Sequence, residues 1–268
     1  MLGAVVGDII GSAYEHEGIK TTDFPLFSDK SHFTDDTVMT LATARALMFC
    51  MRTRKDTVTE EKFSRSFMWT MRRHGRDFPD AGYGRGFKAW LLAKNPHPYQ
   101  SWGNASAMRV SPISWAFDDL ETVERFAEVS AVITHDHPEG IKGARSVAGA
   151  VFLARTGHSK DEIRSYITGK YGYDLSRSLD EIRPDYSYCS SCPGSIPEAF
   201  TAFLEGESFE DVVRKAVSLG GDADTLSAIA GSIAEPFFGI PALLQVEAYE
   251  RLHHDLQYIE CKWEQWRN

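Results

Sequence analysis

Apolar residues recur along this chain at intervals of three and four, the spacing of one face of an α-helix. Runs of strict two-residue alternation, which would indicate strands, are nearly absent. The pattern predicts an all-α fold, with residues 1–268 forming a single compact helical bundle of about ten helices. We expect one helix in the opening stretch, two more starting at residues 159 and 208, and others near 38–51, 60–72, 118–134, 138–157, 197–204, 225–234 and 241–254.

Glycine occupies every fourth position of the opening stretch, at Gly3, Gly7 and Gly11. This spacing places the three glycines on one ridge of a helix, where another backbone can approach closely. Each glycine weakens an isolated helix by about 1 kcal/mol, so three in register indicate close packing or a ligand.

Two of the expected helices carry almost no charge. Between residues 38 and 51 only two threonines and one arginine are polar, and between 225 and 234 no residue is charged. A helix that is apolar nearly all round is a buried one. We therefore expect both helices to lie inside the bundle, with Pro236 ending the second.

A matching acidic cluster stands directly before each of these two helices. Thr34-Asp35-Asp36-Thr37 precedes the first, and Asp222-Ala223-Asp224-Thr225 precedes the second. One such cluster alone is more often structural, because threonine or aspartate before a helix acts as an N-cap and acids in the first turn suit the helix dipole. Two clusters together place four aspartates on core helices, where bare charges are costly to desolvate.

Two divalent cations would balance the four aspartates of the clusters. Carboxylates, threonine hydroxyls and water are the ligands that magnesium or manganese prefers, and the lack of histidine and cysteine argues against zinc. Two such ions about 3.5–4 Å apart could orient a diol or a phosphate and acidify a water. These residues predict a binuclear magnesium or manganese hydrolase on a helical scaffold, without indicating which bond is cleaved.

Glycines and arginines interleave between residues 73 and 86. This stretch is expected to be a flexible loop whose backbone N–H groups can approach a ligand, although a plain surface loop is equally consistent with it. Residues 102–112 are dense in small and polar side chains, and we expect a second loop there that leads into a helix.

The composition is that of an ordinary globular protein, with 43% hydrophobic and 25% charged residues. The formal net charge of −9 disfavours binding to nucleic acid and to anionic membranes. The opening residues lack the basic region of a signal peptide, and no apolar run reaches the ~20 residues of a membrane span. We expect a cytoplasmic monomer whose four cysteines are ordinary thiols. At the C-x-x-C pair Cys189 and Cys192, a redox site or half of a metal site is the less favoured alternative.

Several strings of the sequence resemble the ADP-ribosylglycohydrolase family, whose founding type reactivates dinitrogenase reductase. They run in the family's order from residue 3 to about residue 239 and so span nearly the whole chain. The strings are the opening glycine stretch, Phe33 to Thr40, Gly103 to Val110, Thr134-His135 and Gly220 to Gly231. The paired aspartate motifs together with the Gly-Asn…Ala-Met-Arg string are highly specific.

The resemblance implies an all-α fold with two magnesium ions, or manganese in their place, in a central cleft. It also implies hydrolysis of the bond between C1 of the distal ribose of ADP-ribose and an acceptor atom, through an oxocarbenium-like transition state. One of Asp36, Asp224 or Glu15 would take the proton of the attacking water. The family's metal ligands correspond here to Thr34, Asp35, Asp36, Asp222, Asp224 and Thr225.

The same resemblance places the substrate on the two loops. His135 would border the ribose or a phosphate, with a helix-end histidine bonded to backbone as an equal alternative. Ala105 stands where family members often have a second glycine, a change that can reshape the phosphate loop but removes no ligand. The residues implied to cradle the diphosphate are Gly82, Gly84, Gly86, Gly103, Asn104, Ala105 and Ser106.

The implied substrate is an ADP-ribosylated protein or a small ADP-ribose conjugate. Protein arginine is the first acceptor to consider, with Asp80 as a residue that could anchor its guanidinium. Serine, a nucleic-acid base and the acetyl ester of ADP-ribose are the alternatives. Two other functions stay open, a non-catalytic ADP-ribose-binding module and a binuclear phosphohydrolase acting on the pyrophosphate.

Overall fold

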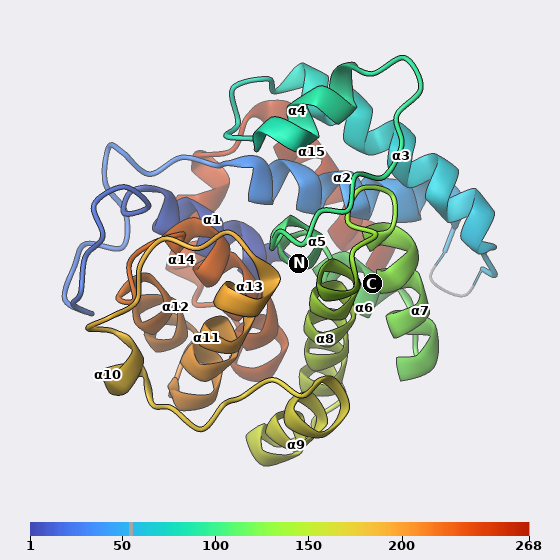
Figure 1. Cartoon of the computed structure of the whole chain (residues 1–268). Helices are drawn as coiled ribbons and strands as arrows, with labels where there is room; N and C mark the ends of the chain where they lie inside the picture. Colours follow the sequence, from blue (N-terminus) through green and yellow to red (C-terminus); the bar gives the residue numbers. More distant parts are fainter. Residues whose placement is uncertain (54–55, 268) are drawn as a thin grey trace.

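Helices make up all the regular structure that the computed structural model describes, which covers residues 1–53 and 56–267. The all-α prediction is confirmed (Figure 1). Within the described residues there are fifteen helices: α1 (Leu2–Ser12), α2 (Asp35–Cys50), α3 (Glu60–Asp77), α4 (Arg85–Leu92), α5 (Ala105–Met108), α6 (Ser111–Ala116), α7 (Leu120–Ala131), α8 (Pro138–Arg155), α9 (Lys160–Tyr171), α10 (Leu179–Ile182), α11 (Cys192–Glu205), α12 (Phe209–Val217), α13 (Ala223–Phe238), α14 (Ala242–Glu250) and α15 (His254–Arg267).

Helices α1 and α13 pack backbone to backbone in the interior. A Cβ added to Gly7 would lie 2.1 Å from the carbonyl oxygen of Ser227, and one added to Gly3 would lie 2.3 Å from that of Gly231. No side chain fits at these distances, so only glycine permits the contact. The glycine ridge of the opening helix therefore serves close helix packing, one of the two roles that its spacing predicted.

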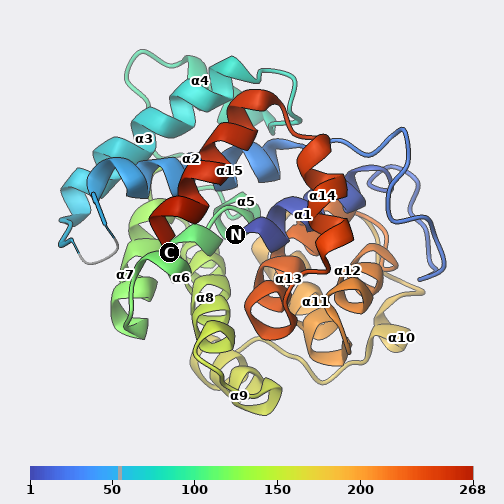
Figure 2. The same cartoon turned by 180° about the vertical axis from the view of Figure 1, so that it is seen from behind.

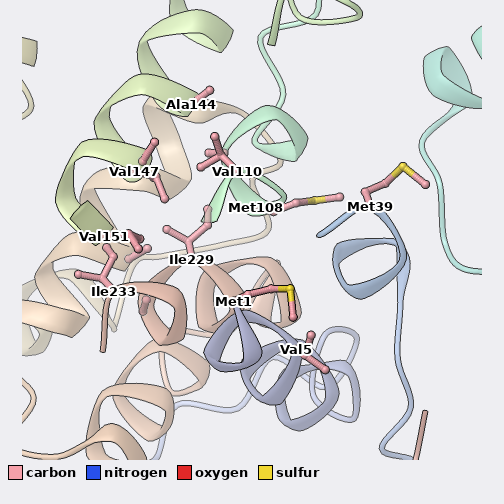
Figure 3. Close-up of a cluster of buried hydrophobic side chains, with 14 of the residues drawn as sticks. Met1, Val5, Met39, Met108, Val110, Ala144, Val147, Val151, Ile229 and Ile233 are labelled. Atoms are coloured by element: carbon pink, nitrogen blue, oxygen red, sulfur yellow. The ribbon is translucent and has the colours of Figure 1, made fainter. Parts of the chain in front are cut away.

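The core lies where α1, α2, α5, α8 and α13 meet. Figure 3 shows side chains gathered in this region, most of them from these helices, and all of those that it labels are buried. Helices α2 and α13 are buried over most of their length, which confirms the prediction made from their lack of charge. The labelled residues are Met1, Val5, Met39, Met108, Val110, Ala144, Val147, Val151, Ile229 and Ile233.

The remaining helices surround this core. Helix α3 packs along α2, and α7 and α9 flank α8 (Figure 1). Seen from behind, α15 crosses the back of the molecule and packs against α2, while α14 lies against α1 (Figure 2). The indole Nε1 of Trp266 donates to the carbonyl of Met51, 3.2 Å away, and so ties the last helix to the end of α2. None of the described helices is both long and apolar enough to cross a membrane.

The number of helices predicted from periodicity was too low. Helices α4, α5, α6 and α10 have eight residues or fewer, and so few turns give no readable period. The stretch 73–86 is not a loop throughout, because α3 continues to Asp77 and α4 begins at Arg85. The single helix predicted near 241–254 is in fact α14, which ends at Glu250, and it is followed by α15.

Two helices extend past the prolines at which they were predicted to begin or end. Helix α11 begins at Cys192, five residues before Pro197, with Pro193 in its first turn. Pro236 lies inside α13, which continues to Phe238. A proline in the last turn removes only its own N–H bond, and the turn is closed by Gly239 N donating to Glu235 O at 2.9 Å.

Candidate metal and substrate site

The two acidic clusters open α2 and α13, as predicted. Thr34 is the N-cap of α2, and its hydroxyl accepts from the N–H of Asp36 at 3.3 Å. Asp222 is the N-cap of α13, but its carboxylate makes no capping bond and is free to interact elsewhere. The hydroxyl of Thr225 donates to Asp36 Oδ2 at 3.0 Å, so the two clusters touch directly across 189 residues of sequence.

The turn before Asp222 requires two glycines. Gly220 has a φ of 70° and Gly221 a φ of 72°, a left-handed conformation that side chains disfavour. A Cβ on Gly221 would also lie 3.0 Å from the Cα of Tyr188. This turn sets the direction in which the second cluster enters the site.

Asp8 of α1 is a member of the site that the sequence did not lead us to assign. It is fully buried, and its carboxylate accepts from the N–H groups of Thr34 (2.9 Å) and Thr37 (3.1 Å) and from the Thr34 hydroxyl (2.6 Å). It thereby caps α2 from another helix. The available signal was an aspartate in an apolar helix whose glycine ridge already required tight packing.

Two groups of carboxylates come close enough to share cations. One ligand oxygen from each of Asp8, Asp36 and Asp224 lies within 4.8 Å of the others, and the same holds for Glu15, Asp222 and Asp224. Asp224 belongs to both groups, so they form one continuous acidic site. A third group, His253, His254 and Asp255, is exposed at the start of α15.

The acids of this site fit divalent cations. In the described part of the chain, no lysine or arginine forms an ion pair with Asp8, Asp36, Asp222 or Asp224, although all four are at least 95% buried. The Oδ1 atom of Asp36 is buried without any hydrogen-bond partner. An unpartnered carboxylate oxygen among other carboxylates is costly unless a cation binds it. The donor set consists only of oxygen atoms, which suits magnesium or manganese.

Burial and mutual repulsion make the site strongly attractive to positive charge. Burial, with the charges of Asp8 and Asp222, raises the pKa of Asp35 to about 8. Burial also raises the pKa of Asp222 to about 6. The pKa values of Asp36 and Asp224 are raised well above the ordinary range, first by burial and then by neighbouring carboxylates. A bound cation would relieve this repulsion.

These acids form one end of a cleft of about 250 Å³. Its lining includes most of the predicted metal and substrate residues, namely Asp35, Asp36, Gly82, Gly84, Gly86, Gly103, Asn104, Ala105, His135, Asp222, Asp224 and Thr225. It also includes residues that the sequence reasoning did not assign, namely Met39, Phe87, Tyr99, Ser101, Met108, Arg109, Tyr188 and Ser190.

Four predicted residues are not part of this lining. The Thr34 hydroxyl is directed to Asp8, and Glu15 joins the site through its proximity to Asp222 and Asp224. Ser106 is buried behind the loop, where its hydroxyl donates to Gly140 O at 2.8 Å. Asp80 is exposed.

One wall of the cleft is the start of α4. Gly84 is the N-cap of this helix, and Gly84, Gly86 and Phe87 line the cleft. The first N–H groups of a helix have no partner within it and favour anions. Gly82, which precedes them, has a φ of 103°, and a Cβ there would lie 3.1 Å from Asp35 Oδ1. This wall therefore presents backbone next to the acidic end.

Another part of the lining is the loop at Gly103 and Asn104, which is tied to the segment before α11. Asn104 N donates to Ser190 O at 2.9 Å, and Cys192 N donates to Trp102 O at 2.8 Å. The Asn104 side chain points to the acidic end, where its Nδ2 donates to Asp222 Oδ2 at 2.6 Å. This contact shows that the loop and the second acidic cluster are one unit.

His135 lines the cleft in a fixed tautomer. The Thr134 hydroxyl lies 2.9 Å from an Arg109 nitrogen and 2.7 Å from His135 Nδ1. Arginine only donates, so the Thr134 oxygen accepts from it. Among the described residues the buried Thr134 hydroxyl has no other acceptor, so its proton is satisfied only when it is donated to Nδ1. Burial and the nearby Arg109 charge lower the pKa of His135 well below its ordinary value. The ring is therefore neutral, with its proton on Nε2.

Comparisons with known proteins find relatives over nearly the whole chain. The model of the ADP-ribosylglycohydrolase family matches residues 1–263. The chain is 27% identical to the ADP-ribosylhydrolase ARH3 of Mus musculus, covering 90% of this chain and 83% of that protein. It is 23% identical to the ADP-ribosylarginine hydrolase Tri1 of Serratia proteamaculans, covering 97% of this chain and 78% of that protein. A solved structure described as an ADP-ribosylglycohydrolase-related protein complex shares the fold, with a TM-score of 0.70 at 23% identity over 100% of this chain and 96% of that one.

Proposed function

Because the chain belongs to the ADP-ribosylglycohydrolase family and is therefore a hydrolase of ADP-ribosyl linkages, we propose that it releases ADP-ribose from a modified acceptor with two bound magnesium ions. One observation carries the proposal. Two linked groups of carboxylates, all buried except Glu15, meet beside a cleft whose lining includes glycine loops. The acids suit cations beside a ribose, and the loops suit a diphosphate.

The residues that would hold the ions come from both clusters. Asp36 and Asp224 stand at the centre, with Asp35 and Asp222 beside them. The threonine hydroxyls of each cluster donate their protons to Asp8 and Asp36. The Thr225 oxygen keeps its lone pairs for a cation, and the Thr34 oxygen keeps one, since it also accepts from Asp36 N. Bound magnesium, or manganese, would supply orientation of the ribose 2- and 3-hydroxyls and a lowered pKa for the attacking water.

Side chains of the protein provide the acceptor for the proton of the attacking water and the negative charge around the ribose. Of the three candidate bases, Asp36 and Asp224 are 2% and 5% exposed, whereas the Glu15 side chain is 23% exposed. Glu15 can therefore pass an accepted proton to solvent, which favours it as the general base. The surrounding carboxylates stabilise the positive charge that develops at C1 of the ribose.

The diphosphate would lie against the start of α4 and beside His135. Gly86 and Phe87, in the first turn of α4, line the cleft and have N–H groups without a partner in the helix, and His135 lines it with its Nε2 proton available. Arg109 is 1% exposed and holds this arrangement from behind through Thr134. The backbone donors and the neutral His135 ring carry no charge, and Arg109 is the cationic side chain among the lining residues.

We propose arginine as the acceptor, with serine, a nucleic-acid base and an acetyl ester as alternatives. The support is the name of the relative Tri1 and the partly exposed acids Glu15 and Asp35 at the acidic end, which would attract a guanidinium. A panel of substrates that carry ADP-ribose on arginine, on serine, on a base or as the acetyl ester tests this assignment. Release from the arginine conjugate should be fastest, and a faster release from any other conjugate reassigns the acceptor.

The activity itself is tested by measuring free ADP-ribose. We expect release with magnesium, its loss after EDTA treatment, and a fall of more than about 100-fold for Asp36→Ala and for Asp224→Ala. Turnover that persists undiminished in EDTA would contradict the magnesium requirement. AMP and ribose phosphate as products would identify a phosphohydrolase instead.

A further inference from the structure

A chain of buried hydrogen bonds runs from α11 into the acidic site. Ser195 is fully buried, and its hydroxyl lies 2.7 Å from the carbonyl oxygen of Cys189. The same hydroxyl lies 3.1 Å from Nδ2 of Asn104, and that nitrogen lies 2.6 Å from Oδ2 of Asp222. The chain therefore joins three segments that are far apart in sequence.

The direction of every bond in this chain follows from counting hydrogens. A backbone carbonyl only accepts, so the Ser195 hydroxyl donates its single proton to Cys189 O. Its oxygen must then accept from Asn104, which requires the NH₂ end of the amide to face Ser195. The second hydrogen of this NH₂ group is directed to the carboxylate of Asp222. Were the amide turned over, its oxygen would face both the serine oxygen and a carboxylate oxygen.

We propose that Ser195 is a positioning residue for the metal site, which orients the Asn104 amide so that it holds Asp222 Oδ2 and leaves Oδ1 for a cation. The proposal rests on the proposed function, because it takes Asp222 as a metal ligand. Among the described residues Ser195 has no hydrogen bond to Asp222 and does not line the cleft, so its link to the site runs through Asn104.

The surroundings of the chain explain how its orientation is kept. The backbone around Asn104 is fixed, since its N–H donates to Ser190 O and its carbonyl accepts from Ala107 N at 2.8 Å. The thiol of Cys192 donates to Gly103 O at 3.1 Å and fills the space behind the loop. Only the side-chain torsion of Asn104 remains to be set, and the Ser195 hydroxyl sets it.

Removing the hydroxyl should weaken cation binding more than it weakens the fold. Partners that orient metal ligands typically contribute 10- to 100-fold in metal affinity. We expect Ser195→Ala to raise the Kd for Mg²⁺ and for Mn²⁺ by about 10-fold. Ser195→Thr keeps the hydroxyl and should retain affinity close to that of the wild type.

The test is titration calorimetry of the full chain with MgCl₂ or MnCl₂ alone, together with thermal unfolding in EDTA. The matched control is Ser114→Ala, because Ser114 is also fully buried and donates to a backbone carbonyl, Ala148 O, at 2.7 Å. Both alanine variants should lose similar stability in EDTA, whereas only Ser195→Ala should lose metal affinity. Asn104→Ala should lose at least as much metal affinity as Ser195→Ala. Adding Ser195→Ala to Asn104→Ala should change the Kd by less than about twofold, because both substitutions break the same series of hydrogen bonds.

The outcomes separate the two proposals. A wild-type chain that binds neither cation overturns the proposed metal-dependent function. A wild-type chain that binds, with a Kd unchanged in Ser195→Ala, overturns the positioning role alone. Additive losses in the double variant overturn it as well, since they would show that Ser195 and Asn104 act separately.

Discussion

Asp8 and Thr34 share a 2.6 Å hydrogen bond between the carboxylate of α1 and the hydroxyl that caps α2. Asp8 also accepts from two N–H groups of the first turn of α2, so one buried side chain satisfies three donors. Asp8→Ala would leave them unpaired, and we expect a loss of about 3 kcal/mol in the free energy of unfolding. Urea denaturation in EDTA measures this loss.

An ordinary N-cap is the control for that experiment. Asp119 caps α7 at the surface through a single bond to Thr122 N at 2.8 Å. Asp119→Ala should cost only about 1 kcal/mol. A loss in Asp8→Ala no greater than in this control would show that Asp8 does not organise the start of α2.

The backbone contact between α1 and α13 predicts a severe effect for Gly7→Ala. The new Cβ would lie 2.1 Å from Ser227 O, and backbone cannot move aside as a flexible side chain can. Overpacking of this kind costs about 1–3 kcal/mol or more. It also shifts Asp8 relative to Asp224, so Mg²⁺ affinity should fall together with the melting temperature.

Gly169→Ala is the control for Gly7→Ala, because it places the same Cβ in a helix where there is room for it. Gly169 is exposed in α9, and a Cβ there would have nothing within 4 Å. Alanine is the better helix former by about 1 kcal/mol, so this variant should be slightly more stable with unchanged Mg²⁺ affinity. If Gly7→Ala and Gly169→Ala had the same melting temperature and the same Mg²⁺ affinity, the close-packing role of the glycine ridge would be refuted.

Sequence alone predicted the all-α class and the buried helices, because both follow from the spacing of apolar residues and the lack of charge within short stretches. It also predicted that two clusters of aspartate and threonine would open core helices, since capping chemistry is local. The role of Asp8 was not predictable in this way. Its three bonds join residues 26 to 29 positions apart, and only the close packing of α1 brings them together.

The residues around the cleft also divide into features that local sequence predicted and features that depend on tertiary contacts. The glycines at 82, 84 and 86 suggested a loop that exposes backbone, but α4 was too short to give a helical pattern. Asn104 was expected to belong to a phosphate loop, which stays a prediction, whereas the bond of its side chain to Asp222, 118 residues later, was not predicted. Ser195 carried no signal at all, because its role depends on two other side chains.

Thr134→Val tests whether His135 donates to the substrate. Valine keeps the shape of threonine but removes the hydroxyl that bonds His135 Nδ1 and accepts from Arg109. The ring is then free to adopt the other tautomer, and the Nε2 donor is lost part of the time. We expect KM for the ADP-ribosyl substrate to rise about 10-fold with a smaller change in kcat. Thr134→Ser keeps the hydroxyl and should behave like the wild type.

Glu198 of α11 predicts a dependence of stability on pH that is separate from the metal site. Burial raises its pKa from the ordinary 4.5 to about 7, and its Oε2 is buried without a hydrogen-bond partner. The fold prefers the protonated form, so the stability that Glu198 contributes is complete below pH 4.5 and is lost as the pH rises through 7. The charged groups around it are Arg177, Asp185, Glu139, Lys142 and Asp174.

Glu198→Gln should therefore gain stability over the wild type at pH 8, by at most about 3 kcal/mol, and show no gain at pH 4.5. Thermal unfolding at a series of pH values measures this difference. The exposed Glu121→Gln serves as the comparison, with no such trend expected. A gain in Glu198→Gln that is the same at every pH would mean that packing, and not ionisation, is responsible.

Glu15→Gln separates proton transfer from cation binding at the acidic end. Glutamine keeps the length and one oxygen of the side chain, but it cannot take a proton from the attacking water. We expect kcat to fall by about 10²- to 10⁴-fold while the Kd for Mg²⁺ rises by less than 10-fold. Asp224 belongs to both carboxylate groups, so Asp224→Asn should instead lose most Mg²⁺ affinity along with activity. If Glu15→Gln loses Mg²⁺ affinity to the same extent as Asp224→Asn, Glu15 is a ligand, and the base must be sought among the buried aspartates.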